Sequence, residues 1–162
     1  MHITLAQQSH SSALANIVKS TFHLACPEDS DPALQSMYIS KHLSESDFLK
    51  FINSDDCIVL VATKDTVVAG LAVIETECQE IAMLSKLYIL PQFHGQGLAP
   101  KLVDEAINQS KTKGFKQLNL SVFSENLKAK AFYEKYGFKH VGECDFHMES
   151  EIHKDHLYEL TL

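Results

Sequence analysis

A glycine-rich turn separates a predicted strand from a predicted helix, and it constrains the fold more than any other feature of the chain. Residues 81–90 are predicted to form the strand and residues 100–113 the helix, and the turn between them holds two of the six glycines. The first N–H groups of a helix have no partner within it, and the helix dipole adds partial positive charge there. Because glycine has no Cβ, an anion can approach such a backbone closely. The segment therefore predicts a cradle for a phosphate ester.

The spacing within the turn excludes two common phosphate-binding motifs. No Gly-Lys-Ser or Gly-Lys-Thr follows, as a P-loop requires, and the dinucleotide pattern would need a glycine where Pro100 stands. The turn matches Gln-x-x-Gly-x-Gly instead, at Gln92, Gly95 and Gly97. The chain contains no arginine. A bound phosphate must therefore be held by backbone N–H groups, helix ends, neutral side chains or lysine.

Composition is that of one folded domain, spanning residues 1–162, and it excludes several classes of function. The chain is 45% hydrophobic and 22% charged, which is ordinary for a globular protein. No apolar run is long enough to cross a membrane and no secretory signal begins the chain, so we expect a cytoplasmic location and no membrane partner. The net charge of −7 argues against nucleic-acid binding.

Cysteine and histidine spacing gives no metal site. The four cysteines are scattered without a C-x-x-C pair, so reduced thiols are expected. Only His153 and His156, in H-K-D-H, stand at a helical i, i+3 spacing, and two such residues are a weak metal signal.

Charge in the first third of the chain bears on the substrate. Residues 1–57 carry three lysines and seven acidic residues, so 3 − 7 = −4. This acidity suits a cationic small substrate, although a solvated acidic surface explains it equally well.

The order of predicted elements indicates a mixed sheet with helices on its faces. Strands are expected to pair as hairpins in the first half of the chain and to alternate with helices in the second. The expected strands cover residues 2–6, 57–63, 67–75, 81–90, 118–122, 138–146 and 157–162, and the expected helices cover residues 11–22, 33–42, 46–53, 100–113 and 126–136.

A second motif follows the strand at 118–122. It reads N-L-K-A-K-A-F-Y-E-K-Y-G-F, residues 126–138. Asn126 and Tyr133 are two helical turns apart and share a face, with the small Ala129 between them. Together with the glycine turn, this block resembles the GNAT superfamily of N-acetyltransferases. The tail, which reads G-F-K-H-V-G-E-C-D-F-H-M and then D-H-L-Y-E-L, looks like that of bacterial members near the spermidine/spermine N-acetyltransferases.

The resemblance implies an α+β fold with a central mixed, mostly antiparallel, twisted sheet of about seven strands, flanked by about four helices. It implies acetyl-CoA as cosubstrate and no metal. The pyrophosphate would lie on the turn, the pantetheine along the strand before it, and the second motif would complete the cofactor site. The residues that the resemblance places on acetyl-CoA are Leu87, Tyr88, Ile89, Gln92, His94, Gly95, Gln96, Gly97, Leu98, Ala99, Asn126, Ala129 and Tyr133.

The implied reaction is direct attack of an amine on the thioester, without a covalent enzyme intermediate. A backbone N–H within Leu87–Ile89 would stabilise the oxyanion, and Tyr133 would protonate the leaving thiolate. Similar sequences often carry a glutamate where Met83 stands. The base that deprotonates the amine is therefore expected to be Glu80 through a chain of waters, or Tyr88 with water.

Several acceptors and one other class of function fit the sequence. A small primary amine is expected, with a polyamine favoured, and an amino acid, an aminoglycoside or a peptide or protein N-terminus remain alternatives. A non-catalytic acyl-CoA-binding sensor is the competing class. Homodimers are frequent among similar proteins, although nothing in the sequence requires one.

Overall fold

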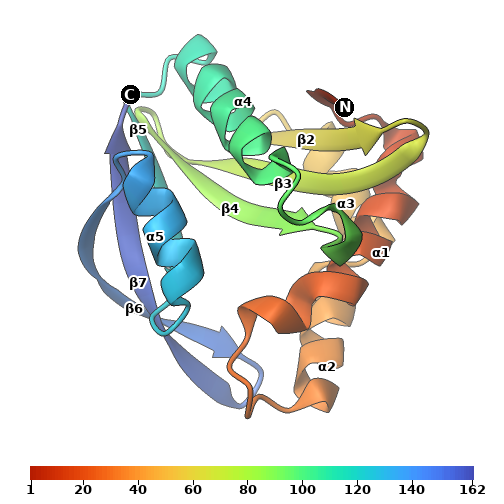
Figure 1. Cartoon of the computed structure of the whole chain (residues 1–162), viewed down its shortest axis with the longest axis vertical. Helices are drawn as coiled ribbons and strands as arrows, with labels where there is room; N and C mark the ends of the chain where they lie inside the picture. Colours follow the sequence, from red (N-terminus) through yellow and green to blue (C-terminus); the bar gives the residue numbers. More distant parts are fainter.

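The computed structural model describes residues 1–162 and contains one seven-stranded sheet (Figure 1). The strand order is β1-β2-β3-β4-β5-β7-β6, and every neighbouring pair is antiparallel except β4 and β5. The mixed, mostly antiparallel sheet expected from the sequence is confirmed. Its strands are β1 (His2–Leu5), β2 (Cys57–Lys64), β3 (Val67–Cys78), β4 (Ile81–Ile89), β5 (Gln117–Phe123), β6 (Lys139–Met148) and β7 (Glu151–Thr161).

Five α-helices accompany the sheet, one at each of the five ranges expected from the sequence and one more than the resemblance implied. None of the protein's helices is long and apolar enough to cross a membrane. The α-helices are α1 (Ser11–Thr21), α2 (Pro32–His42), α3 (Glu45–Asn53), α4 (Leu98–Thr112) and α5 (Leu127–Lys135), and short 3-10 turns lie at η1 (Gln8–His10), η2 (Phe22–Ala25) and η3 (Pro91–Phe93).

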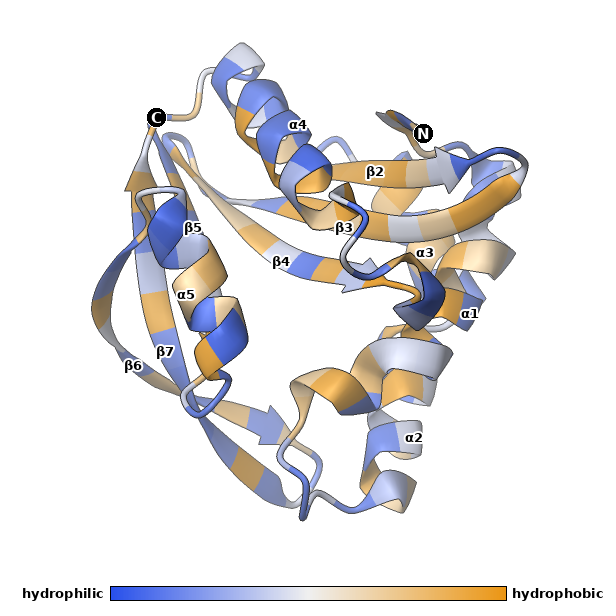
Figure 2. Cartoon of the chain, in the orientation of Figure 1, coloured by the Kyte–Doolittle hydropathy of each residue, from blue (hydrophilic) through white to orange (hydrophobic).

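The central strands of the sheet, β2 and β3 above all, are buried on both faces, which produces two hydrophobic cores (Figure 2). Successive residues of a strand point to opposite faces. Leu60 of β2 therefore packs with α4, whereas Val59 and Val61 pack with α1 and α3. All three side chains are at most 4% exposed. The near-continuous apolar run in β2 is the sequence signature of such a two-sided strand.

A β-bulge at Ser85 bends β4 at the point where it leaves β5. The register with β3 changes from Ile74 opposite Leu84 to Val73 opposite Lys86, so Ser85 is the extra residue. Its Oγ donates a hydrogen bond to the Val73 carbonyl at 3.3 Å. Bulges bend the strand that carries them. Only three residue pairs join β4 to β5, from Ile81–Gln117 to Met83–Asn119, and beyond them the two strands diverge (Figure 1).

The last strand is longer than the sequence indicated. Strand β7 begins at Glu151 rather than at residue 157. The helical spacing of His153 and His156 therefore does not apply, because the two side chains lie on opposite faces of a strand. No group of three potential metal ligands occurs in the structure.

Gly70 of β3 controls how closely the end of β4 can approach, and its replacement gives a first prediction. A Cβ there would lie 2.9 Å from the Tyr88 carbonyl oxygen and 3.1 Å from Ile89 Cγ1. Gly70→Ala should lower the free energy of unfolding by about 1–3 kcal/mol, measured by urea denaturation. Gly142→Ala is the control, since its Cβ would meet only Leu157 Cδ1 at 3.9 Å. Equal stabilities of the two variants would contradict this account.

Candidate active site

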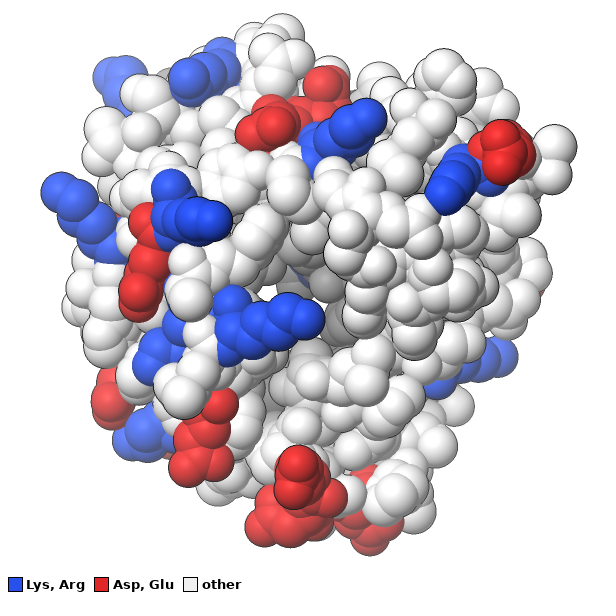
Figure 3. Space-filling view, in the orientation of Figure 1, with Lys and Arg blue, Asp and Glu red and all other residues white.

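A cavity of about 240 Å³ fills the opening between β4 and β5. Figure 3 shows the hollow at the centre of this face of the molecule. Cavities that hold a whole ligand usually measure roughly 300–1,000 Å³, so this one suits the reacting ends of two substrates rather than a whole acyl-CoA. Its lining comes from η2, β4, β5, α5, β6 and β7, and consists of Phe22, Ala25, Cys26, Leu84, Ser85, Lys86, Leu87, Tyr88, Leu120, Ser121, Val122, Phe123, Asn126, Ala129, Tyr133, Phe146, His153 and Asp155.

The glycine turn presents five consecutive backbone N–H groups, those of residues 95–99, which have no backbone acceptor. Gly95 and Gly97 have φ values of 73° and 77°, in the left-handed region that favours glycine. Gly97 is the N-cap residue of α4. Leu98 is 1% exposed, so its side chain belongs to the core and its backbone N–H is the group that it can contribute to an anion site. Free N–H groups at the start of a fifteen-residue helix form an anion site.

Side chains of the turn hold the turn itself in place. The His94 ring donates from Nε2 to the Ile89 carbonyl at 2.8 Å, and Gln96 Nε2 donates to the Gln92 carbonyl at 2.8 Å. Lys64 Nζ donates to Gln96 Oε1 at 2.5 Å. Lys64 therefore places a positive charge beside the free N–H groups, a contribution that no sequence motif indicated.

Strand β4 has an open edge toward the cavity. The Leu90 N–H bonds to the Ala69 carbonyl on the β3 side, and the bonded pairs of an antiparallel ladder alternate. Tyr88, opposite Leu71, therefore also bonds toward β3. The N–H groups of Leu87 and Ile89 point away from β3, toward the gap left by β5. Two of the three backbone positions expected to carry an oxyanion donor thus have a free N–H.

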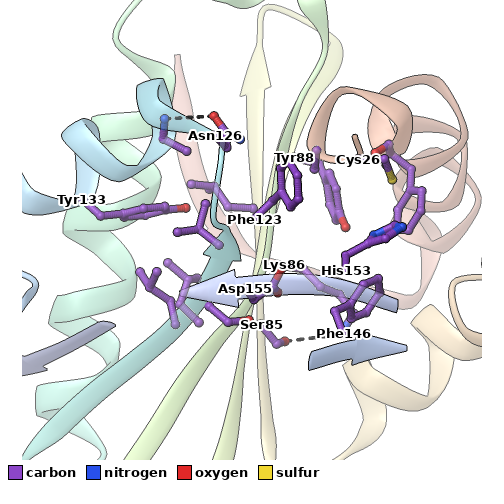
Figure 4. Close-up of a pocket in the computed structure, with 18 residues that line it drawn as sticks. Cys26, Ser85, Lys86, Tyr88, Phe123, Asn126, Tyr133, Phe146, His153 and Asp155 are labelled. Atoms are coloured by element: carbon purple, nitrogen blue, oxygen red, sulfur yellow. Dashed lines mark hydrogen bonds between the residues drawn. The ribbon is translucent and has the colours of Figure 1, made fainter. Parts of the chain in front are cut away.

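Helix α5 supplies the opposite wall. Asn126 caps it by accepting from the Ala129 N–H at 3.2 Å, which leaves the side-chain NH₂ group unused. Tyr133 points into the cavity from this wall (Figure 4). Burial raises the pKa of Tyr133 well above its usual range, so the phenol keeps its proton. The structure therefore brings Asn126, Ala129 and Tyr133 together with Leu87 and Tyr88 around one cavity.

Glu80 lies elsewhere. It precedes β4 at the end where β4 and β5 are paired, and its carboxylate meets Lys116 Nζ at 2.6 Å. Its side chain is 58% exposed and does not line the cavity. The structure does not bring Glu80 near Tyr133 or Leu87.

The side of the cavity formed by η2, β6 and β7 carries titratable residues that sequence reasoning missed. His153 and Asp155 point into it from one face of β7 (Figure 4). Burial raises the pKa of Asp155, while a hydrogen bond from Ser121 and the nearby histidines act in the opposite direction. Had H-K-D-H been read as strand, its alternation would have placed His153 and Asp155 on one face.

Cys26 is the only thiol in the cavity lining, and it is protonated. Its pKa is raised to about 11, first by burial and then by the charges of Glu151 and Asp155. Thiolate is the nucleophilic form of cysteine. The site therefore favours direct attack by an amine over a covalent cysteine intermediate.

Lys86 and Glu75 form an ion pair at the edge of the same side, with Nζ 3.2 Å from Oε2. The Lys86 ammonium also lies 4.5 Å from the centre of the Phe51 ring. Burial alone would raise the pKa of Glu75, but the nearby Ser85 hydroxyl and the charge and hydrogen bond of Lys86 outweigh it and lower the pKa. These two charges neutralise each other, which leaves Asp155 as the uncompensated carboxylate of the cavity lining.

An acidic rim lies along one side of the outer mouth. Two shallower cavities adjoin the main one and share Phe123 with it. Their lining includes the carboxylates of Glu28, Asp29 and Glu125. Figure 3 shows acidic side chains below the hollow on this face. The route to the cavity from this side therefore attracts cations.

Comparisons with known proteins agree with this geometry. The sequence model of the acetyltransferase (GNAT) family matches residues 18–138. An uncharacterised N-acetyltransferase of Mycobacterium tuberculosis is 30% identical over 144 residues, which cover 89% of this chain and 92% of that one. The spermine/spermidine N(1)-acetyltransferase of Bacillus subtilis is 30% identical over 73 residues, covering 44% of this chain and 48% of that one.

A solved structure shares the whole fold. The PaiA N-acetyltransferase from Thermoplasma acidophilum, crystallised in complex with coenzyme A, superposes with a TM-score of 0.84 at 21% identity, and each chain is covered over 100% of its length. The family match spans both motifs identified in the sequence, the glycine turn and the helix after β5. The chain belongs to the GNAT family of acyl-CoA-dependent acetyltransferases.

Proposed function

We propose that the protein transfers an acetyl group from acetyl-CoA directly to a small primary amine, and that a polyamine is its leading acceptor. The observation that carries this proposal is the single cavity in which Tyr133, the open edge of β4 and the carboxylate of Asp155 meet. The first two suit a thioester and the third suits an ammonium group.

The acetyl-CoA side is formed by the turn, β4 and α5. The free N–H groups of residues 95–99 would receive the pyrophosphate. Pantetheine would pair with the open edge of β4, as an added strand does. Its thioester would then lie beside the free N–H groups of Leu87 and Ile89, where one of them stabilises the oxyanion.

The reaction needs a proton for the leaving thiolate, and Tyr133 is placed to give it. The cause of its raised pKa is burial alone, and its hydroxyl has no acceptor in the protein. It is therefore free to donate to sulfur as the C–S bond breaks. The tyrosine recovers its proton from the nitrogen of the new amide, so the enzyme returns to its starting state.

The acceptor side favours a cation with apolar stretches. Aromatic rings of Phe22, Tyr88, Phe123 and Phe146 line it, and such rings attract ammonium groups and cover methylenes. Asp155 lies within this apolar lining, and the acidic rim stands outside it. A polyamine would place one ammonium in the cavity and another at the rim.

The acceptor class is tested by measuring CoA release with a panel of amines at several salt concentrations. Spermidine and spermine should give a higher kcat/KM than lysine or a peptide with a free N-terminus. Their advantage should shrink as ionic strength rises, since salt screens the exposed rim. A peptide that outperforms both polyamines at every salt concentration would contradict the polyamine proposal while leaving the family assignment intact.

Removal of the Tyr133 hydroxyl tests the proposed acid. Tyr133→Phe should lower kcat by about 10²-fold or more and leave the acetyl-CoA dissociation constant within twofold of the original. Because its pKa is raised, the wild-type rate should also show no alkaline loss from tyrosine ionisation below about pH 10. Tyr136→Phe, at the residue that ends the same helix, is the matched control and should keep its kcat. An unchanged kcat in Tyr133→Phe would reject the assignment.

The role of the glycine turn in binding acetyl-CoA can be tested separately. Gly97→Ala puts a Cβ on a residue with φ of +77°, which costs roughly 1–2 kcal/mol in that conformation. The turn should relax, and acetyl-CoA should bind several-fold more weakly by calorimetry. Gly114→Ala is the control, because it combines a φ of +90° with open space at the other end of α4. If both variants bound acetyl-CoA equally well, the turn would not be the pyrophosphate site.

A further inference from the structure

His153 has a polar environment that the reaction described so far does not use. The residue is 8% exposed and lines the cavity. Its ring lies between two aromatic side chains, with centroids 6.3 Å from Phe123 and 6.0 Å from Phe146. The ring is therefore held in one place at the acceptor side of the cavity.

A carboxylate fixes which nitrogen of His153 carries the proton. His153 Nε2 lies 2.8 Å from Glu151 Oε1. An ionised carboxylate only accepts hydrogen bonds, so Nε2–H must be the donor. Nδ1 of the neutral ring then keeps a lone pair. This nitrogen has no hydrogen-bond partner in the protein. It is also not sealed from solvent, because the single side-chain polar atom that is both buried and unpartnered is His156 Nδ1.

Glu151 is itself held by the segment that leads into α2. Ser30 Oγ donates to Oε1 and the Asp31 N–H donates to Oε2, each at 2.8 Å. The Asp31 N–H, the His153 ring and the Ser30 hydroxyl together lower the pKa of Glu151. The carboxylate thus stays charged and orients the imidazole, as in other pairs of a carboxylate and a histidine.

We propose that His153 is the general base that removes a proton from the acceptor ammonium, and that Glu151 is its positioning residue. The inference rests on the proposed function, and it supplies the base that Glu80 is too far removed to provide. Asp155, two residues along the same face of β7, would hold the incoming ammonium beside Nδ1. The charged and titratable groups that face His153 or share its cavities are Cys26, Asp29, Lys86, Tyr88, Glu125, Tyr133, Glu151, Lys154 and Asp155.

The step balances without a further reactant. The ammonium gives one proton to His153 Nδ1 and becomes a neutral amine. The nitrogen lone pair forms the C–N bond with the thioester carbon, and the C–S bond breaks as Tyr133 protonates the sulfur. The second proton leaves the nitrogen and restores Tyr133. His153 releases its proton to solvent, so the products are the amide, CoA thiol and one proton.

The test compares pH profiles of kcat/KM for the wild type and His153→Gln with spermidine as acceptor. Glutamine can still donate to Glu151, so the fold should persist. We expect a loss of about 10²–10⁴-fold near neutral pH and an unchanged dissociation constant for acetyl-CoA. The loss should shrink as pH rises, because more of the amine is then already deprotonated. His147→Gln, on the exposed face of β6, is the matched control and should keep the wild-type profile.

A second variant keeps the test decisive if His153→Gln fails to fold. The acidic limb of the pH profile is the fall in kcat/KM at low pH, where the base is protonated. Glu151→Gln removes the negative charge that stabilises the imidazolium. The acidic limb should therefore move to lower pH, and kcat/KM should fall. An unmoved limb would overturn the proposal. So would a His153→Gln variant with the wild-type profile, or an acidic limb lost only in Asp155→Asn, which would make Asp155 the base. A wild type that binds acetyl-CoA but transfers to no amine would overturn the proposed function as well.

Discussion

The β-bulge at Ser85 is the constraint on which the site depends. It comes two residues after the last pairing between β4 and β5 and turns the rest of β4 away from its neighbour. Leu84 and Leu87 then pack on the same face of the sheet, which an unbroken strand would place on opposite faces. The bend in β4 opens a cavity through the sheet and leaves backbone groups of β4 without a strand to pair with.

The divergence of β4 and β5 also gives the cavity two chemically different sides. On one side, α4 and α5 present backbone N–H groups and a protonated phenol. On the other, η2, β6 and β7 present aromatic rings, a histidine and carboxylates. We propose that each side binds one substrate, so that the thioester and the amine meet in the cavity between them. The open strand edge is a local cost that the two large cores offset.

The geometry of the half of the site that we propose for the cofactor was predictable because its signals are local. Glycines before a helix start and an asparagine cap followed by a tyrosine two turns later can be recognised within short segments of chain. The mixed sheet with helices on its faces followed from the alternation of strands and helices, whereas the order of its strands, with β7 between β5 and β6, was not predicted. Free N–H groups at 95–99 follow from the turn sequence alone, since glycine spacing and the helix start determine them.

The acceptor half was not predictable in the same way, because long-range contacts build it. Glu151 meets Ser30 and Asp31 across about 120 residues of chain. The start of β7 lacks a hydrophobic run and so escaped detection, and His153 and Asp155 escaped with it. The bulge at Ser85 has no sequence signature either. Glu80 is near β4 in sequence, but it precedes the strand at its paired end, and its carboxylate pairs with Lys116.

The central claim is that acetyl-CoA occupies the gap beside β4 as an added strand would. Residue-resolved amide hydrogen exchange, with and without acetyl-CoA, tests it most directly. When acetyl-CoA binds, exchange should slow at Leu87 and Ile89 and at residues 95–99, while Tyr88, which already bonds toward β3, should change little. Unchanged exchange at Leu87 and Ile89 in the saturated protein would contradict the claim, because the open edge of β4 would then not bind the cosubstrate.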